Sequence, residues 1–394
     1  MLNPAFQAKQ LIAGWQNEYY LKQTEKRTYL CTNKPKMTDN LEKYTAKPDS
    51  DDKYIGLQER IELLAKLGDY LQSNDEQLQH CISISYAENR WFTPENIRKA
   101  LNSISQSFLE KDKLISWTEH YKLADKPLVS KSVGLIMAGN IPLVGFHDVL
   151  CIFICGHKAV MKCSDKDKRL LPLMIEKLAE WNPNIREYFS FSEMLKEKDA
   201  YIATGSNNSA RYFASYFDKY PNIIRKNRNA VAVLDGKESS EELIALGNDI
   251  FSYFGLGCRN VSKIYVPEGY DLTILLEVLH DSFKEAVTHD KYKNNFDYNY
   301  ALYLLNKVKF LATGSLLLTE DNSLHSRIAA LHYEFYSDIG LLEKSLIEME
   351  SEIQCIASHV QFSAIQTIPL GTTQQPGLFD YADGVDVIHF LQNL

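Results

Sequence analysis

The chain has 394 residues, 45% of them apolar, and exceeds the size at which one hydrophobic core keeps growing, so two domains are expected. Its formal net charge of -8 is spread along the sequence without a basic block, which excludes nucleic acid as an expected partner. The seven cysteines lack the even number and close spacing of a secreted disulfide framework, and no signal-peptide pattern opens the chain, so we expect a cytoplasmic protein.

The N-terminal third is expected to be mainly helical. Residues 1–52 are polar and weakly periodic, which predicts an N-terminal extension, and translation could begin at Met37 instead of Met1. Between residues 57 and 71, leucine and isoleucine recur at helical spacing and predict a helix with one buried face. The run Thr93-Pro94-Glu95 combines a cap, a first-turn proline and an acidic residue, and so predicts the start of another helix.

From Ser132 onward, short apolar runs alternate with helical stretches, a pattern that is typical of a parallel, doubly wound sheet. The expected strands are 133–137, 159–161, 200–203 and 230–234. The most apolar stretch, 133–161, is interrupted by polar residues, whereas a transmembrane helix needs about 20 predominantly apolar residues. We therefore interpret this stretch as buried core, without a membrane span.

A polar stretch, residues 235–240, separates these strands from a predicted helix (241–253), a glycine turn and a further predicted strand (263–266). We place a domain boundary at this stretch. The expected units are an extension (1–52), a helical region with a nucleotide-binding domain (53–235), a catalytic domain (236–364) and a C-terminal return or oligomerisation element (365–394).

The segment Phe254–Ser262 places Cys258 in a glycine turn between a predicted helix and a predicted strand. Glycines allow a substrate to approach the backbone closely, and the neighbouring Arg259 favours the thiolate over a thiol whose ordinary pKa is about 8.5. A small cysteine buried in a loop is the alternative interpretation, and on this segment alone it is the commoner case. Cys258 is thus a candidate nucleophile.

Three further segments, each placed just after a predicted strand, suit ligand binding. Asn140, in the run Ala138–Leu143, could donate its amide N–H to a developing oxyanion, or be an ordinary turn asparagine. Lys162 and Ser164 could contact a nucleotide, although an exposed lysine is commoner. Thr204, Gly205 and Ser206 suit an anion at a helix N-terminus. No G-x-G-x-x-G string accompanies them, so that fingerprint does not indicate dinucleotide binding.

Taken in this order, the four segments resemble the aldehyde dehydrogenase superfamily over residues 132–267. The strings Ala138–Pro142, Met161–Ser164 and Thr204–Ser206 look like the family's asparagine, cofactor-lysine and nucleotide-loop motifs, and Gly255–Asn260 looks like its nucleophile motif. This last string and the tail Pro376–Asp386 are more similar to the LuxC-type acyl-CoA reductases than to hydrolytic members of the superfamily.

One departure from the hydrolytic pattern is informative. Hydrolytic members have a general-base glutamate in a Glu-Leu-Gly-Gly string, where this chain has Ile224-Arg-Lys-Asn227. Glu238, Glu241 and Glu242 follow, but we interpret them as solvated acids at a helix start. Hydrolysis of an acyl-enzyme needs an activated water and reduction needs hydride and a proton, so the missing base favours thioester reduction.

The resemblance implies an α/β fold with a Rossmann-like cofactor domain, an α/β catalytic domain and a helical N-terminal region. It implies that Cys258 forms a cysteinyl acyl-enzyme with acyl-CoA while Asn140 stabilises the oxyanion. Lys162, Ser164 and the loop Thr204–Ser206 would hold NADPH, with NADH as the alternative. We expect a homo-oligomer, with an acyl-activating ligase as a possible partner. An acyl-phosphate reductase of the same superfamily and a non-enzymatic acyl carrier or scaffold remain alternatives.

A metal site is not expected. His147, Cys151 and Cys155 occupy positions i, i+4 and i+8 of one predicted helix, but residues eight apart are about 12 Å apart at the helical rise and cannot share one ion. Asp148, in the same helix, is expected to cap its first turn rather than to act in catalysis.

Overall fold

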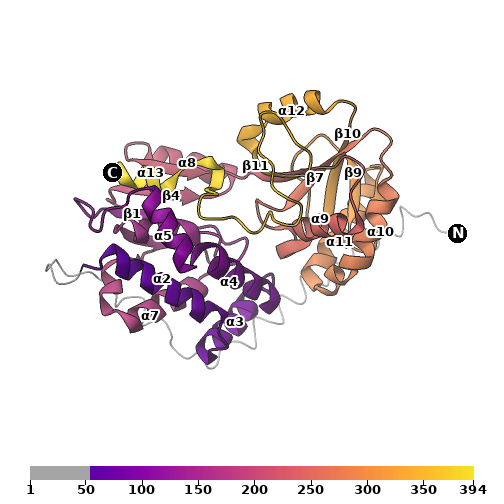
Figure 1. Cartoon of the computed structure of the whole chain (residues 1–394). Helices are drawn as coiled ribbons and strands as arrows, with labels where there is room; N and C mark the ends of the chain where they lie inside the picture. The colour runs from indigo at the N-terminus through magenta and orange to yellow at the C-terminus, as the bar shows by residue number, and fades with distance from the viewer. Residues whose placement is uncertain (1–53) are drawn as a thin grey trace.

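The computed structural model describes residues 54–394, and the expectations for residues 1–52 and Met37 lie outside the described residues. The described chain forms two α/β units that lie side by side (Figure 1). The helices are α2 (Leu57–Gln72), α3 (Glu76–Glu88), α4 (Pro94–Phe108), α5 (Lys111–His120), α6 (Phe146–Ile154), α7 (Leu170–Trp181), α8 (Asn207–Phe217), α9 (Ser240–Phe251), α10 (Leu272–Phe283), α11 (Asp290–Leu305), α12 (Ile339–Glu348) and α13 (Val387–Gln392).

The N-terminal helices begin where the sequence predicts. Helix α2 starts at Leu57 and buries its leucine and isoleucine face. The Thr93 hydroxyl accepts the N–H of Asn96, and Pro94 occupies the first turn of α4. Both predictions are confirmed, because cap chemistry and apolar periodicity act within a few residues and do not depend on distant packing.

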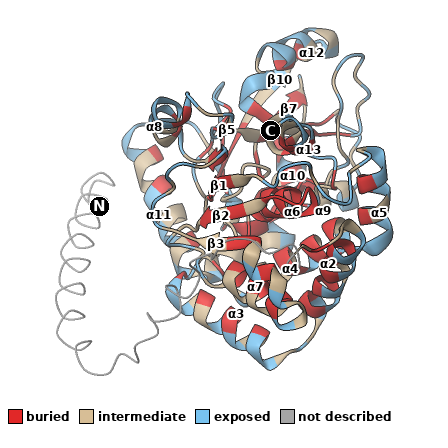
Figure 2. Cartoon of the chain, turned by 90° about the vertical axis from the view of Figure 1, so that its left-hand side faces the viewer, coloured by how far each residue is buried: buried red, intermediate tan, exposed pale blue. Residues whose placement is uncertain are grey.

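The first sheet is fully parallel and has the strand order β3-β2-β1-β4-β5. Its strands are β1 (Ser132–Ile136), β2 (Lys158–Lys162), β3 (Phe189–Phe191), β4 (Ala200–Thr204) and β5 (Asn222–Arg225). Their apolar residues are buried between helices, as expected of an α/β sheet (Figure 2). The core formed with α2, α4, α6 and α7 contains the fully buried Trp117, and α8 packs through Phe217 against Tyr201 of β4.

The second sheet has the order β11-β6-β7-β10-β9-β8, with the short β8 antiparallel to β9 and the other pairs parallel. Its strands are β6 (Asn229–Val233), β7 (Val261–Pro267), β8 (Leu311–Ala312), β9 (Leu317–Glu320), β10 (Ala330–Tyr336) and β11 (Ile353–Ala357). Residues 230–234 belong to this second sheet and not, as the sequence pattern predicts, to the first, because β6 pairs with β7 and β11. The chain passes between the sheets at residues 226–228, inside the expected unit 53–235.

The C-terminal segment returns to the first unit. After β11, residues 358–386 run from the second sheet across to the first, and the yellow end of the chain lies beside the magenta elements in Figure 1. Helix α13 buries Val387, Ile388 and Leu391 in the first core, and the imidazole of His157 pairs with the Leu391 carbonyl at 3.2 Å. The tail therefore fastens the two units together.

Among residues 54–394, every helix is too short or too polar to cross a membrane, for which about 20 predominantly apolar residues are needed.

Candidate active site

A cleft of about 670 Å³ lies where the two sheets meet. It is lined by residues that follow the carboxyl ends of β1, β2, β4 and β5, and by residues at the amino ends of β6, β7 and β10. The strand order of the first sheet places β2 and β4 on opposite sides of β1, and such a switch point is where open α/β sheets bind ligands. Asn140, Ser164, Thr204, Gly205, Ser206 and Cys258 all line this cleft.

Cys258 is presented by a strained loop that follows α9. Tyr253, Phe254 and Gly255 have φ angles of 50°, 59° and 74°, a left-handed conformation that non-glycine residues adopt at a cost of about 1 kcal/mol or more each. The buried Asn260 holds the loop: its amide donates to the carbonyls of Asp249 (2.9 Å) and Ser252 (2.8 Å), and its Oδ1 accepts the Gly257 N–H (2.8 Å). This network fixes the backbone on both sides of the cysteine.

Opposing influences act on the Cys258 thiol. Burial raises the pKa of Cys258 and nearby Asp383 raises it further, whereas Arg259 and Arg225 lower it. The backbone N–H of Cys258, directed at its own sulfur, also favours the thiolate. The two arginines therefore offset part of the cost of ionising a buried thiol.

Asn140 faces the cysteine loop. Its Nδ2 donates to the Leu256 carbonyl at 2.7 Å, and a carboxamide nitrogen carries a second N–H. The structure thus places Asn140 against the loop that carries Cys258.

Arg225 is a site residue that the sequence analysis did not select. It ends β5, is 5% exposed and forms a two-pronged ion pair with the buried Asp148 of α6, in which Nη2 lies 2.8 Å from Oδ1. Asp148 was expected to cap its helix and is instead the partner of this arginine. Arginine stays protonated, so a guanidinium occupies the region where a general base would be expected. No local pattern predicts this pair, whose members are 77 residues apart.

Carboxylates are scarce in the cleft. Among the residues that the structure describes, Asp383 is the only acid in its lining, and its carboxylate lies 3.3 Å from Arg228 Nε. The cations in the lining are Lys166, Arg225, Lys226, Arg228 and Arg327. The cleft is thus basic in a chain whose net charge is -8.

The acids that follow β6 lie far from the cysteine. Since β6 and β7 are parallel, Glu238 beyond the end of β6 and Cys258 before the start of β7 are at opposite edges of the sheet, about 20 Å apart for strands of this length. Glu242 closes a capping box with Ser239, and Glu241 lies in the same first helical turn. The interpretation as helix-start acids therefore agrees with the structure for Glu241 and Glu242, whereas Glu238 precedes the helix and is half-buried in the turn after β6.

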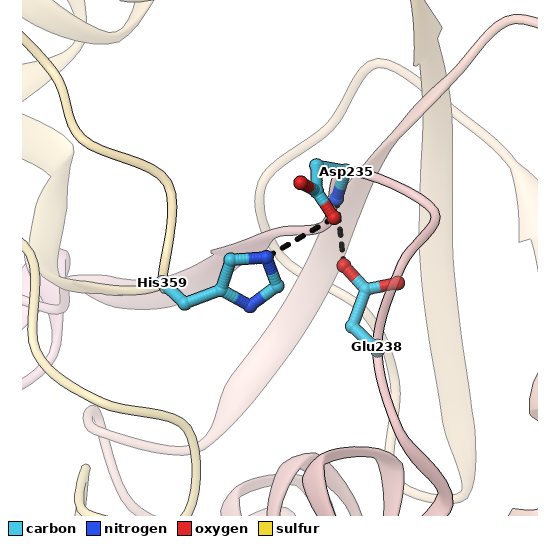
Figure 3. Close-up of side chains that lie close together, drawn as sticks. All are labelled: Asp235, Glu238 and His359. Atoms are coloured by element: carbon cyan, nitrogen blue, oxygen red, sulfur yellow. Dashed lines mark hydrogen bonds and ion pairs between the residues drawn. The ribbon is translucent and has the colours of Figure 1, made fainter.

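Figure 3 shows Asp235, Glu238 and His359 at this far edge. His359 Nε2 is 3.0 Å from Asp235 Oδ1, and Glu238 accepts the backbone N–H groups of Asp235 and Gly236. The carboxylates are thus already used to close the turn between β6 and α9.

Two glycines in the cleft lining, Gly139 and Gly205, lie so close to neighbouring side chains that a larger residue would not fit. A Cβ on Gly139 would lie 2.5 Å from Ser164 Oγ, and a Cβ on Gly205 would lie 2.8 Å from the Cβ of Ser209. Ser206 caps α8 by accepting the Ser209 N–H at 3.2 Å. The cleft therefore meets the N-terminus of an 11-residue helix, which suits an anionic group.

Lys162 is the one candidate site residue that does not line the cleft. Its ammonium donates to the Glu193 carbonyl at 2.9 Å and lies 3.8 Å from the Glu193 carboxylate. The cleft lining contains Lys166, four residues further along, instead of Lys162.

A second cavity, here called the side pocket, has a volume of about 150 Å³ and shares part of its wall with the cleft, including Val144, Arg225 and Cys258. Its wall also includes His147, which is half-buried and contacts the Leu378 carbonyl through Nε2 at 3.1 Å. Burial lowers the pKa of His147 to about 4, so this imidazole is neutral near pH 7. Cys258 therefore lies between two cavities.

The chain was compared with known proteins by sequence and by structure, and only the structure has matches. No family model and no curated protein matches the sequence. The structure is similar to the aldehyde dehydrogenase KauB from Pseudomonas aeruginosa, with 12% identity over 79% of this chain and 73% of that chain and a TM-score of 0.57. A mutant of aldehyde dehydrogenase C from Pseudomonas syringae, in complex with NAD+ and octanal, matches with 12% identity over 79% of this chain and 74% of that chain and a TM-score of 0.57.

Lactaldehyde dehydrogenase from Escherichia coli matches with 13% identity over 78% of this chain and 75% of that chain, and its TM-score is also 0.57. The chain has the aldehyde dehydrogenase fold. The expected fold class, a Rossmann-like domain beside a second α/β domain, is thereby confirmed. At these identities the likeness shows the fold alone, so an activity has to be argued from the site.

Proposed function

We propose that this protein is an NADPH-dependent acyl-CoA reductase of the LuxC type, which converts an acyl thioester to an aldehyde through an acyl-enzyme at Cys258. One observation carries the proposal. Cys258 lines the same cleft as Arg225, which is paired with Asp148 and cannot activate water, and the chain has the aldehyde dehydrogenase fold. The expected residues Asn140, Ser164, Thr204, Gly205 and Ser206 line the same cleft.

In the first half-reaction the Cys258 thiolate attacks the thioester carbonyl. A bond forms between Sγ and the acyl carbon, the carbon–sulfur bond to CoA breaks, and the CoA thiolate takes a proton from water. The free N–H of Asn140 and the main-chain N–H of Cys258 are the donors for the negative oxygen of the tetrahedral intermediate. Donors fixed before reaction need little reorganisation when the charge develops.

In the second half-reaction, a reduced nicotinamide held by Ser164 and the loop Thr204–Ser206 would supply hydride to the acyl carbon. The same donors hold the oxyanion until the carbonyl reforms and the bond to Sγ breaks, which releases the aldehyde and regenerates the Cys258 thiolate. Arg225 and Arg259 favour this thiolate as a leaving group as well as a nucleophile. Since the cleft lacks an unpaired carboxylate among its described residues, attack by water on the acyl-enzyme is disfavoured.

The cleft fits a phosphorylated dinucleotide. Gly139 and Gly205 keep the backbone close to Ser164 and to the start of α8, where a pyrophosphate would be held by N–H groups. Lys166 and Lys226 add positive charge, which favours the extra phosphate of NADPH over NADH. Lys162 donates to the Glu193 carbonyl, so it would have to leave Glu193 in order to bind the cofactor.

The test is NADPH oxidation with a panel of acyl-CoAs, with released CoA thiol titrated in parallel. We expect oxidation matched by thiol release in the wild type and at least about a 1,000-fold loss in Cys258→Ala, because the acyl-enzyme cannot form. Cys81→Ala is the matched control, since Cys81 lies in α3 and lines neither cavity. Reduction of an acyl phosphate without use of acyl-CoA, or acylation of Cys258 without oxidation of NADPH, would contradict the proposal.

Two assembly proposals accompany this function: a homo-oligomer, and delivery of acyl groups by an acyl-activating ligase. Sedimentation of the purified protein, alone and with a candidate ligase, tests both.

A further inference from the structure

Three cations from distant parts of the chain lie near one another at one end of the cleft. They are Arg90, between α3 and α4, Lys166, after β2, and Lys291, in the first turn of α11. Lys166 lines the cleft, whereas Arg90 and Lys291 are outside its lining. Because Arg90 and Lys166 belong to the first unit and Lys291 to the second, only the folded chain forms this group.

Hydrogen bonds to main-chain atoms join the three segments. Asn89 Nδ2 donates to the Lys166 carbonyl at 3.3 Å, and His289 Nε2 donates to the Arg90 carbonyl at 2.8 Å. Lys291 follows His289 by two residues. Residues 89–90 therefore contact both of the segments that carry the two lysines.

An aromatic stack fixes the group against the cleft wall. The His289 ring lies 4.3 Å from the Phe254 ring and 5.2 Å from the Trp91 ring, between their centres. Phe254 lines the cleft, in the loop that presents Cys258. Lys291 Nζ lies 5.7 Å from the centre of the Trp91 ring. The ammonium is thus held beside the wall of the cleft.

The three positive charges are not neutralised by the protein. Among the residues that the structure describes, none of the three forms an ion pair with a carboxylate, and Arg90 lies instead over the Tyr86 ring at 4.6 Å. Burial lowers the pKa of Lys291, and Lys166 and Arg90 lower it further. Acidic residues outnumber basic ones in the chain, 51 to 43, so unpaired neighbouring cations are not a consequence of composition. An anion among them would relieve their repulsion.

The donors of this group match a phosphomonoester. Such a phosphate carries between one and two negative charges near pH 7 and has three strong acceptor oxygens. Arginine offers a planar fork of donors, and lysine offers a point charge on a flexible stem. NADPH and CoA each carry one phosphomonoester on the ribose, at the 2′ and 3′ positions, in addition to the pyrophosphate that suits the start of α8.

We propose that Arg90, Lys166 and Lys291 form a subsite for the ribose phosphomonoester of a nucleotide in the cleft, supplied by NADPH or by the CoA part of the thioester. The proposal rests on the proposed reductase function for the identity of the nucleotide, and it extends the binding site to two residues outside the cleft lining.

The test is isothermal titration calorimetry of the full chain with two pairs of ligands that each differ by one phosphate. The pairs are NADP+ with NAD+, and CoA with dephospho-CoA. We expect the wild type to bind the phosphorylated member of one pair at least about tenfold more tightly, because hydrogen bonds between charged groups are strong. Arg90→Gln and Lys291→Gln should each reduce this preference by about fivefold or more and leave the affinity for the unphosphorylated member unchanged.

Lys293→Gln is the matched control. Lys293 lies about 200° around α11 from Lys291, and its ammonium is 2.9 Å from the Asp297 carboxylate. This variant removes one charge from the same helix and should keep the wild-type preference. Thermal melting verifies that each variant is folded.

The pair that responds to Arg90→Gln and Lys291→Gln identifies the source of the phosphate. Equal binding within both pairs in the wild type, or a preference that both substitutions leave intact, would overturn the subsite while the reductase could still stand. A preference that these substitutions abolish, in a protein that oxidises NADPH with no acyl-CoA, would uphold the subsite and refute the reductase. Failure to bind any of the four ligands would refute both.

Discussion

Cys258 depends on neighbouring charges to become reactive. Burial raises its pKa, and Arg259 is the first of the two arginines that oppose this effect. Arg259 contacts the Asp380 carbonyl through one 3.3 Å hydrogen bond, so its removal should disturb the fold little.

Replacement of Arg259 by methionine should move the alkylation of Cys258 to higher pH, because the thiolate loses a favourable charge. The measurement is the rate of iodoacetamide labelling of Cys258 as a function of pH. Arg211→Met, on the exposed face of α8, should follow the wild-type curve. An unchanged midpoint in Arg259→Met would show that Arg259 does not tune the thiol.

The ionised form of Asp167 lowers the stability of the fold, because its carboxylate is largely removed from water. Its carboxylate accepts the Leu143 N–H at 2.6 Å, and burial raises the pKa of Asp167 to about 6. Because the folded protein binds this proton more tightly than the unfolded chain, stability falls as the pH rises from about 4 to about 6.

The variant Asp167→Asn removes this titration and should gain up to about 3 kcal/mol relative to the wild type between about pH 4 and pH 7, the equivalent of about two pKa units. Urea unfolding at a series of pH values measures the difference. Asp165→Asn, an exposed neighbour, provides the control. Parallel stability curves for Asp167→Asn and the wild type would contradict the expectation.

At the scale of elements, the loop between α9 and β7 stores backbone strain that Asn260 offsets. Four polar contacts converge on this one buried side chain, and its removal leaves backbone carbonyls and the Gly257 N–H without partners. The loop would then relax away from its left-handed residues.

We expect Asn260→Ala to lower the free energy of unfolding by about 2 kcal/mol or more and to reduce the acylation rate of Cys258 more than about tenfold. Urea unfolding and mass spectrometry of the acylated protein provide the two readouts. Asn248→Ala, exposed on α9, is the control. A variant that kept the wild-type acylation rate would show that the loop does not need this anchor.

Elements with local signals were predictable from sequence, and long-range partnerships were not. Thr93 and Pro94 mark a helix start within one turn, and Gly205 marks a strand-to-helix turn. The apolar run of β6 predicts a buried strand but contains no information about which sheet it joins, because pairing with β7 and β11 is decided across the chain. Cys258 and Asn140 are candidates on sequence alone because they lie in strings that resemble family motifs.

The remaining site residues lacked any such signal. Arg225 and Asp148 are separated by 77 residues, and the sequence around each looks like an ordinary strand end and helix start. The side pocket likewise combines α4, the segment after β1 and the returning segment, which only the folded chain brings together.

At the scale of the whole molecule, the two sheets face one cleft with opposite edges. The first presents its carboxyl edge and the second its amino edge, and the segment from β11 to α13 connects them a second time. The stability of the first unit therefore depends on the last residues of the chain.

Ile388 is fully buried in α13, so Ile388→Ala should lower the free energy of unfolding by about 2–5 kcal/mol. His389→Ala, on the exposed side of the same helix, should have little effect. Urea denaturation followed by tryptophan fluorescence makes the comparison, since Trp117 lies in the same core. Equal stability of the two variants would show that α13 is dispensable.

The position of Cys258 between two cavities has a consequence for inhibitor design. A thiol-reactive warhead bonded to Sγ has two directions in which to grow, and their walls differ in charge and size. An anionic extension suits the basic cleft, and a compact apolar extension suits the side pocket. Two chemically unrelated series of covalent inhibitors can therefore share one anchoring atom, and a resistance mutation at a residue that lines only one cavity would leave the other series effective.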